Sequence, residues 1–152
     1  MSRDDSNRDG PVLVSACLLG LCTRYDGTCE LRAELVESLR GRWVMPVCPE
    51  QLGGLPTPRA ASEIEAGDGA AVLEGAARVV NAQGRDVTVN YLLGARQVLR
   101  LAETFGASRA ILKEGSPACG VSRIKRAGRD LSGMGVAAAL LHRKGVIVEG
   151  IE

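Results

Sequence analysis

Short apolar runs alternate with longer segments in which apolar and polar residues are mixed. The apolar runs are rich in Val, Leu and Ile, and they predict four buried strands, at 11–17, 43–47, 109–114 and 146–148. In the mixed segments, apolar residues recur with the period of a helix. These segments predict three amphipathic helices, at 31–40, 86–104 and 133–143.

The remaining segments are predicted from turn residues and weaker periodicity. Residues 53–59, GGLPTPR, are rich in Gly and Pro and predict a loop. Residues 70–80 alternate imperfectly and predict one or two short strands. Asp86 is expected to be the N-cap of the long helix, and Gly106 is expected to end it.

Strands and helices that alternate along a chain are typical of the α/β class. Because the predicted strands are apolar without alternation, they suit a parallel sheet that helices cover on both faces, in a layering of the Rossmann or flavodoxin kind. The length of 152 residues fits one compact domain. We expect this domain at 11–152, after a polar, disordered lead-in at 1–10.

Charge and hydropathy narrow the possible partners. The formal net charge is +1, which favours a small-molecule partner over a nucleic acid. A basic cluster is expected to be a solvated loop, with a phosphate-binding arm as the alternative; it contains Arg123, Lys125, Arg126 and Arg129. No apolar run reaches the length of about 18 residues that a membrane span requires. The polar N-terminal segment lacks the apolar centre of a secretory signal, so the expected location is the cytoplasm.

The chain has five cysteines, which is an odd number for a complete set of disulfides. Stable disulfides are also rare in the reducing cytoplasm. The thiols are therefore expected to be free, bound to metal or reactive.

Three of the cysteines share one position relative to the predicted strands. Cys17, Cys48 and Cys119 each lie at or just beyond the carboxyl end of a strand. In open parallel sheets, ligands bind outside these ends, so the three thiols could meet in one crevice together with Glu50 and Ser116. Three thiolates can hold zinc or an iron–sulfur cluster. Three buried, inert thiols remain an alternative, because free cysteine is often buried.

Several longer motifs resemble those of the thiouracil desulfidase family, which was long catalogued as a domain of unknown function. The resemblance covers nearly everything from Leu13 to Val148, in order. The motifs are VSACLLG, RYDG, PVCPEQLGGLPTPR, GRDVT, AILKEGSPACG and GVAAALL.

The resemblance implies a cofactor, a reaction and a set of site residues. It implies a 4Fe-4S cluster with three ligands, Cys17, Cys48 and Cys119, and with one iron left open for the sulfur of the substrate. It further implies that Glu50 and Ser116 are catalytic. The implied enzyme converts a thiocarbonyl of a thiolated pyrimidine base or nucleotide, of the 2- or 4-thiouracil type, to a carbonyl. Sulfide is released without a redox step.

Other residues carry weaker expectations. Asp26 could orient a base edge or only form a turn, and Arg59 and Lys113 could bind a substrate phosphate or carbonyl or form surface ion pairs. No role is expected for Cys22 and Cys29. The alternative function is a non-catalytic α/β protein that binds zinc or an iron–sulfur cluster and senses redox state.

Overall fold

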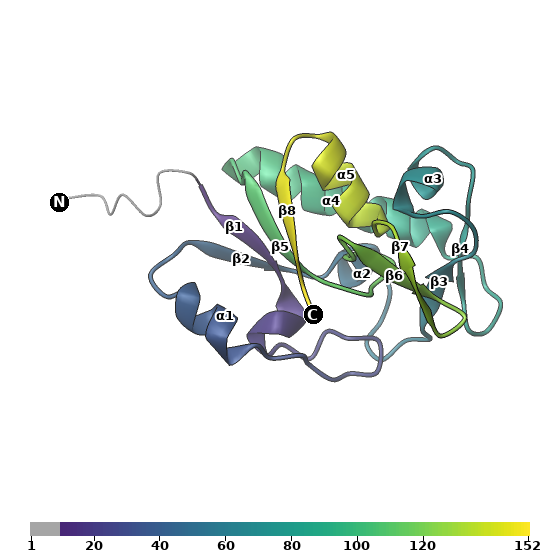
Figure 1. The fold of residues 1–152 in the computed structure, drawn as a ribbon, viewed down its shortest axis with the longest axis horizontal. Helices are drawn as coiled ribbons and strands as arrows, with labels where there is room; N and C mark the ends of the chain where they lie inside the picture. The colour runs from purple at the N-terminus through teal and green to yellow at the C-terminus, as the bar shows by residue number, and fades with distance from the viewer. Residues whose placement is uncertain (1–9) are drawn as a thin grey trace.

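The computed structural model describes residues 10–152, so the predicted lead-in lies almost entirely outside the described residues. Four parallel strands form the central sheet, in the order β2-β1-β5-β8 (Figure 1). Their bounds are Val12–Ser15 for β1, Val44–Val47 for β2, Arg109–Lys113 for β5 and Ile147–Ile151 for β8. Each lies within two or three residues of a strand that the apolar pattern predicts.

Helices cover both faces of this sheet (Figure 1). The helices α4 (Thr88–Phe105) and α5 (Val136–Arg143) cover one face, where they pack on Leu13 and Ala110. The short 3-10 helix η2 (Ala16–Leu19) and helix α1 (Ala33–Ser38) lie at the other face, which buries Val12, Val14 and Ile111. Successive strand residues thus enter opposite apolar layers, which explains the strands without alternation. The predicted α/β class and its parallel sheet are confirmed.

Four short elements lie between β2 and α4 in the chain. Helix α2 (Pro49–Leu52) follows β2, and β3 (Ser62–Ile64) pairs antiparallel with β4 (Val79–Asn81). The prediction of strands over 70–80 is wrong for its first half, which is helix α3 (Gly69–Leu73). Asp68 caps this helix, because its carboxylate accepts a hydrogen bond from the N–H of Ala70 at 3.1 Å.

The start of α4 differs slightly from the prediction. The helix begins at Thr88 and its cap residue is Val87, one position after Asp86. The Asp86 carboxylate still accepts hydrogen bonds from the Thr88 N–H at 2.9 Å and the Thr88 hydroxyl at 2.6 Å. At the other end, Gly106 adopts a left-handed φ of 72°, as a helix stop requires.

The basic cluster is a β-hairpin rather than the predicted solvated loop. Strands β6 (Arg123–Arg126) and β7 (Arg129–Ser132) pair antiparallel. The Arg126 guanidinium donates hydrogen bonds to the carbonyl oxygens of Ile64, at 2.7 Å, and Gly67. These bonds hold the hairpin against β3.

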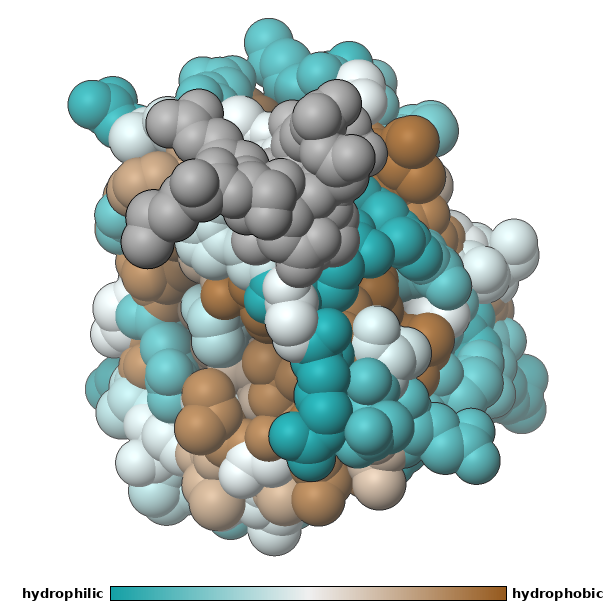
Figure 2. All heavy atoms as spheres, turned by 90° about the vertical axis from the view of Figure 1, so that its left-hand side faces the viewer, coloured by the Kyte–Doolittle hydropathy of each residue, from teal (hydrophilic) through white to brown (hydrophobic). Residues whose placement is uncertain are grey.

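The opposite end of the molecule, at the amino ends of the strands, presents apolar side chains among polar ones (Figure 2). There the half-exposed rings of Trp43 and Phe105 pack edge to face, with centroids 6.3 Å apart. Within residues 10–152, no helix has the length and apolarity needed to cross a bilayer.

Candidate functional site

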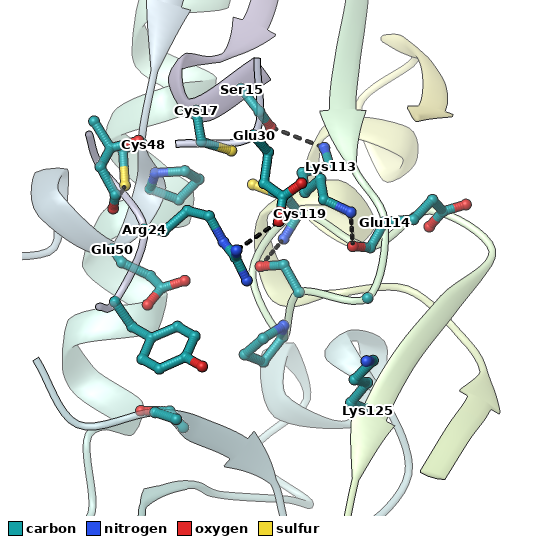
Figure 3. A pocket seen from close by; sticks show the side chains of 18 of the residues that line it. Ser15, Cys17, Arg24, Glu30, Cys48, Glu50, Lys113, Glu114, Cys119 and Lys125 are labelled. Carbon is teal, nitrogen blue, oxygen red and sulfur yellow. Dashed lines mark hydrogen bonds and ion pairs between the residues drawn. The ribbon is translucent and has the colours of Figure 1, made fainter. Parts of the chain in front are cut away.

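Three cysteines lie at the carboxyl ends of three neighbouring strands. Cys17 lies in η2 directly after β1, Cys48 follows β2, and Cys119 lies in the loop after β5. Because these strands are adjacent and parallel, their carboxyl ends meet, and all three cysteines line one pocket of about 420 Å³. They gather along one side of it, with Glu50 below Cys48 (Figure 3).

The three thiols are free, and the surroundings of Cys17 and Cys119 disfavour an isolated thiolate. Burial and the negative charge of Cys48 raise the pKa of Cys17, while Arg24 and Lys113 oppose the rise. Burial also raises the pKa of Cys119, against a hydrogen bond with Ser15. A metal centre would reverse this preference, because coordination stabilises the thiolate form.

Within the part of the chain that the structure describes, no three His, Cys, Asp or Glu side chains are grouped closely enough to hold one metal ion. The donor chemistry nevertheless fits an iron–sulfur cluster. Three unpaired thiols from separate strands border a pocket with room for a group, and thiolates are the ligands that such clusters use.

The remaining cysteines lie elsewhere. Cys22 and Cys29 are exposed in the segment between η2 and α1, and neither lines the pocket. The structure therefore separates the five thiols into three that border the pocket and two that face solvent.

Glu50 is placed by the packing of α2 on α4. Helix α2 docks so closely that a Cβ added at Gly94 would lie 2.0 Å from the carbonyl oxygen of Pro49. A Cβ added at Gly53 would lie 2.1 Å from the carbonyl oxygen of Asn90. Only glycine permits this approach, and it brings Glu50, the second residue of α2, to the pocket wall.

Arg59 holds the Glu50 carboxylate in place. Its Nε donates to Glu50 Oε2 at 2.8 Å, and the two side chains are only 5% and 15% exposed. The guanidinium also donates to the Thr23 and Pro56 carbonyl oxygens and the Thr57 hydroxyl, at 2.9, 3.2 and 2.9 Å. Burial opposes the cation, but the charge of Glu50 and its hydrogen bond raise the pKa of Arg59. Arg59 therefore forms an ion pair, which was one of its two expected roles, but the pair is buried and not at the surface.

Ser116 and Cys119 are fixed in the same loop. The Ser116 Oγ accepts hydrogen bonds from the N–H groups of Ala118 and Cys119, both at 3.1 Å. The buried Glu114 carboxylate ties down the next residues by accepting from the N–H groups of Val121 and Ser122, at 2.7 and 3.0 Å. A hydroxyl also has one proton to donate, so Ser116 can still donate toward the pocket that it lines.

The other two residues expected at the site, Lys113 and Asp26, differ in their position relative to the pocket. Lys113 lines the pocket, donates through Nζ to the Glu114 carbonyl oxygen at 3.3 Å, and has its pKa lowered by burial. Asp26 is exposed and does not line the pocket. Its carboxylate accepts from the Thr28 hydroxyl at 2.6 Å and the Thr28 N–H at 3.1 Å, and these bonds lower its pKa. The turn-forming role is the one observed for Asp26.

Several residues of the pocket wall are not among the site residues that the sequence predicts. Arg24 reaches the middle of the pocket and pairs with Glu30 at 2.5 Å, while Lys125 lies on the far side (Figure 3). Ser15 and Tyr91 also line the pocket. The signals were indirect: Arg24 opens the RYDG motif, Lys125 belongs to the basic cluster, and Tyr91 lies on the apolar face of a predicted helix.

Comparisons with known proteins give consistent matches. A family model described as 2-thiouracil desulfurase matches residues 12–150. The uncharacterised protein YbbK of Bacillus subtilis (strain 168) is 42% identical over 137 residues, which cover 88% of this chain and 91% of YbbK. The solved structure of TudS, a 4Fe-4S-dependent thiouracil desulfidase, is 39% identical with a TM-score of 0.79. The match covers 92% of this chain and 89% of that one.

Proposed function

This chain belongs to the 2-thiouracil desulfurase family, and on that premise we propose that it is a desulfidase. The proposed reaction replaces the sulfur of a thiocarbonyl on a pyrimidine base or nucleotide with the oxygen of water, and releases sulfide. The observation that carries the proposal is the row of three thiols at adjacent strand ends, in one pocket with Glu50 and Ser116.

In this proposal Cys17, Cys48 and Cys119 hold a 4Fe-4S cluster. When bound, such a cluster supplies a thiophilic Lewis acid at the iron that lacks a cysteine ligand. Two cations near the thiols, Arg24 and Lys113, support the proposal, because the charge of each lowers the pKa of Cys17 against the effect of burial. Positive charge beside the thiols would stabilise the negative charge of several thiolate ligands.

Glu50 is the proposed general base. Its carboxylate takes a proton from the water that attacks the thiocarbonyl carbon, and it returns a proton to the departing sulfur. The balance is then one thiocarbonyl and one water giving one carbonyl and hydrogen sulfide. Arg59 supports this role, because it binds Oε2 of Glu50 and so fixes the direction of the carboxylate.

Ser116 is the proposed hydrogen-bond donor to the pyrimidine ring. Its oxygen already accepts two backbone N–H groups, which fix its position and leave the hydroxyl proton to donate. The same turn positions the sulfur of Cys119. One loop would therefore fix the position of the pyrimidine ring relative to the cluster.

The proposed substrate is a small molecule, either a thiolated base or its nucleotide. The pocket volume of about 420 Å³ lies within the usual range for such ligands. Lys113 and Lys125 supply positive charge on its wall for a phosphate or a ring carbonyl. A cytoplasmic location is proposed as well, since free thiols persist in a reducing compartment.

The experiment that tests the proposal is turnover by anaerobically reconstituted protein in ¹⁸O-labelled water. Candidate substrates are 2-thiouracil, 4-thiouracil and 4-thiouridine monophosphate. We expect sulfide release and a labelled carbonyl in the product with at least one of them, and a loss of at least about 100-fold for Glu50→Gln. A colourless zinc protein that converts none of these substrates would contradict the proposal and favour the non-catalytic alternative.

A further inference from the structure

The Tyr91 hydroxyl is a buried polar group without a partner in the pocket. Tyr91 lies in α4, lines the pocket and is only 2% exposed. Within residues 10–152, its Oη is the one buried side-chain nitrogen or oxygen that makes no hydrogen bond. Native proteins contain few such groups, because a desolvated donor without an acceptor is costly.

The neighbours of this hydroxyl do not satisfy it. Glu50 and Ser62 approach Oη closely enough for a weak side-chain interaction that affects the pKa of Tyr91, yet neither is in hydrogen-bond geometry with it. Burial raises the pKa of Tyr91 well above its ordinary value, and the negative charge of Glu50 raises it further. The hydroxyl is therefore protonated at neutral pH and can donate a hydrogen bond.

A phenylalanine would fill the same space in α4 without leaving a buried hydroxyl unpaired. The oxygen is thus available to a group that enters the pocket and accepts a hydrogen bond from it. That group must reach a point beside Glu50, where an acceptor carboxylate and a donor hydroxyl stand next to each other.

We propose that Tyr91 donates a hydrogen bond to the ring carbonyl that neighbours the reacting thiocarbonyl, and that it thereby selects substrates that carry this carbonyl. The inference rests on the proposed desulfidase function. In 2-thiouracil and in 4-thiouracil, one ring N–H lies between the thiocarbonyl and a carbonyl. Glu50 can accept from that N–H while Tyr91 donates to the carbonyl, so the pair matches this edge of the ring.

The test compares wild type with Tyr91→Phe on two substrates, 2-thiouracil and pyrimidine-2-thione, which lacks the ring carbonyl. For Tyr91→Phe we expect kcat/KM on 2-thiouracil to fall by about 10-fold, as for the loss of one hydrogen bond in a buried site. On pyrimidine-2-thione, kcat/KM should be unchanged or higher. Pyrimidine-2-thione also lacks the N–H beside the carbonyl. The difference between the two ratios therefore isolates the contact of Tyr91 with this edge of the ring, because the thiocarbonyl is common to both substrates.

Two further measurements do not depend on turnover. The holoenzyme should bind uracil, which carries the carbonyl but cannot be desulfurated, about 10-fold more weakly after Tyr91→Phe. The thermal midpoint without ligand should stay the same or rise, because an unpaired buried hydroxyl is removed. The control is Arg96→Ala on the same helix, because Arg96 is exposed and does not line the pocket. This variant should keep the wild-type affinity for uracil.

The outcomes separate the inference from the function on which it rests. If wild type converts 2-thiouracil but Tyr91→Phe affects both substrates equally, or lowers the unliganded thermal midpoint, the inference is wrong and Tyr91 has a structural role. If wild type neither converts a thiolated pyrimidine nor binds uracil, the proposed function is wrong, and the inference is overturned with it.

Discussion

Arg59 gives the sharpest stability prediction, because it is the buried partner of a proposed catalytic carboxylate. The substitution Arg59→Met keeps much of the side-chain volume and removes the charge. It breaks the 2.8 Å ion pair with Glu50 and leaves that carboxylate, only 15% exposed, without its cation. It also leaves the carbonyl oxygens of Thr23 and Pro56 without this donor.

The expected cost follows from the burial of the pair. Removing one partner of a buried ion pair destabilises a protein by about 3–5 kcal/mol, because the other charge stays desolvated. The matched control is Arg78→Met. It breaks the pair between Arg78 and Glu65, which has two bonds of 2.9 Å but side chains 61% and 42% exposed. An exposed pair of this kind contributes at most about 1 kcal/mol.

The assay is urea denaturation followed by circular dichroism at pH 7, with the protein prepared in the same way for each variant. Arg59→Met should lower the free energy of unfolding by about 3–5 kcal/mol, and Arg78→Met by less than about 1 kcal/mol. The double variant Glu50→Gln, Arg59→Met should be more stable than Arg59→Met alone, because no buried charge remains. Equal losses for Arg59→Met and Arg78→Met would refute the assignment of a buried, energetically important pair.

Two other predictions concern helix α4. Gly94→Ala places a methyl group 2.0 Å from the Pro49 carbonyl oxygen. It should cost about 1–3 kcal/mol in thermal or urea unfolding and reduce turnover by displacing α2, whereas the exposed Arg96→Ala should be nearly neutral. Hydrogen bonds from Thr88 lower the pKa of Asp86 below its ordinary value of 3.8. The stabilisation that Asp86 provides is therefore fully present above this ordinary value, and it is lost as the pH falls through the pKa of the folded state. The stability gap between wild type and Asp86→Ala should therefore narrow in acid; an equal gap at pH 7 and pH 2 would contradict this role.

The parts of the fold that the sequence predicts are those governed by local apolar pattern. The strands that contain Val14 and Ile111 are continuous apolar runs because both faces of the sheet are covered. Their carboxyl ends could be located to within a few residues, and parallel pairing then brings Cys17, Cys48 and Cys119 to one edge.

The elements that the sequence misses depend on distant partners. Strand β6 is charged, and it is held by bonds from Arg126 to backbone oxygens about sixty residues earlier. Its hairpin did leave one local signal. Ala127 and Gly128 both adopt positive φ, of 52° and 74°, as a two-residue turn of this kind requires, and Gly128 suits that conformation.

The finer features of the site are three-dimensional and have no local signature. The sequence cannot show that Arg59 is buried against Glu50, since a charged residue in a Gly- and Pro-rich loop is usually exposed. Nor can it show that the Tyr91 hydroxyl lacks a partner, because the helical period indicates only that the ring faces inward.

The central claim is that Cys17, Cys48 and Cys119, and not the two exposed cysteines, hold one iron–sulfur cluster. The most direct test is iron and acid-labile sulfide analysis of anaerobically reconstituted wild type and of each single Cys→Ala variant. Wild type, Cys22→Ala and Cys29→Ala should each bind about four irons with matching sulfide, and the other three variants should lose the cluster. Bound zinc in wild type, or cluster loss in Cys22→Ala or Cys29→Ala, would contradict the claim.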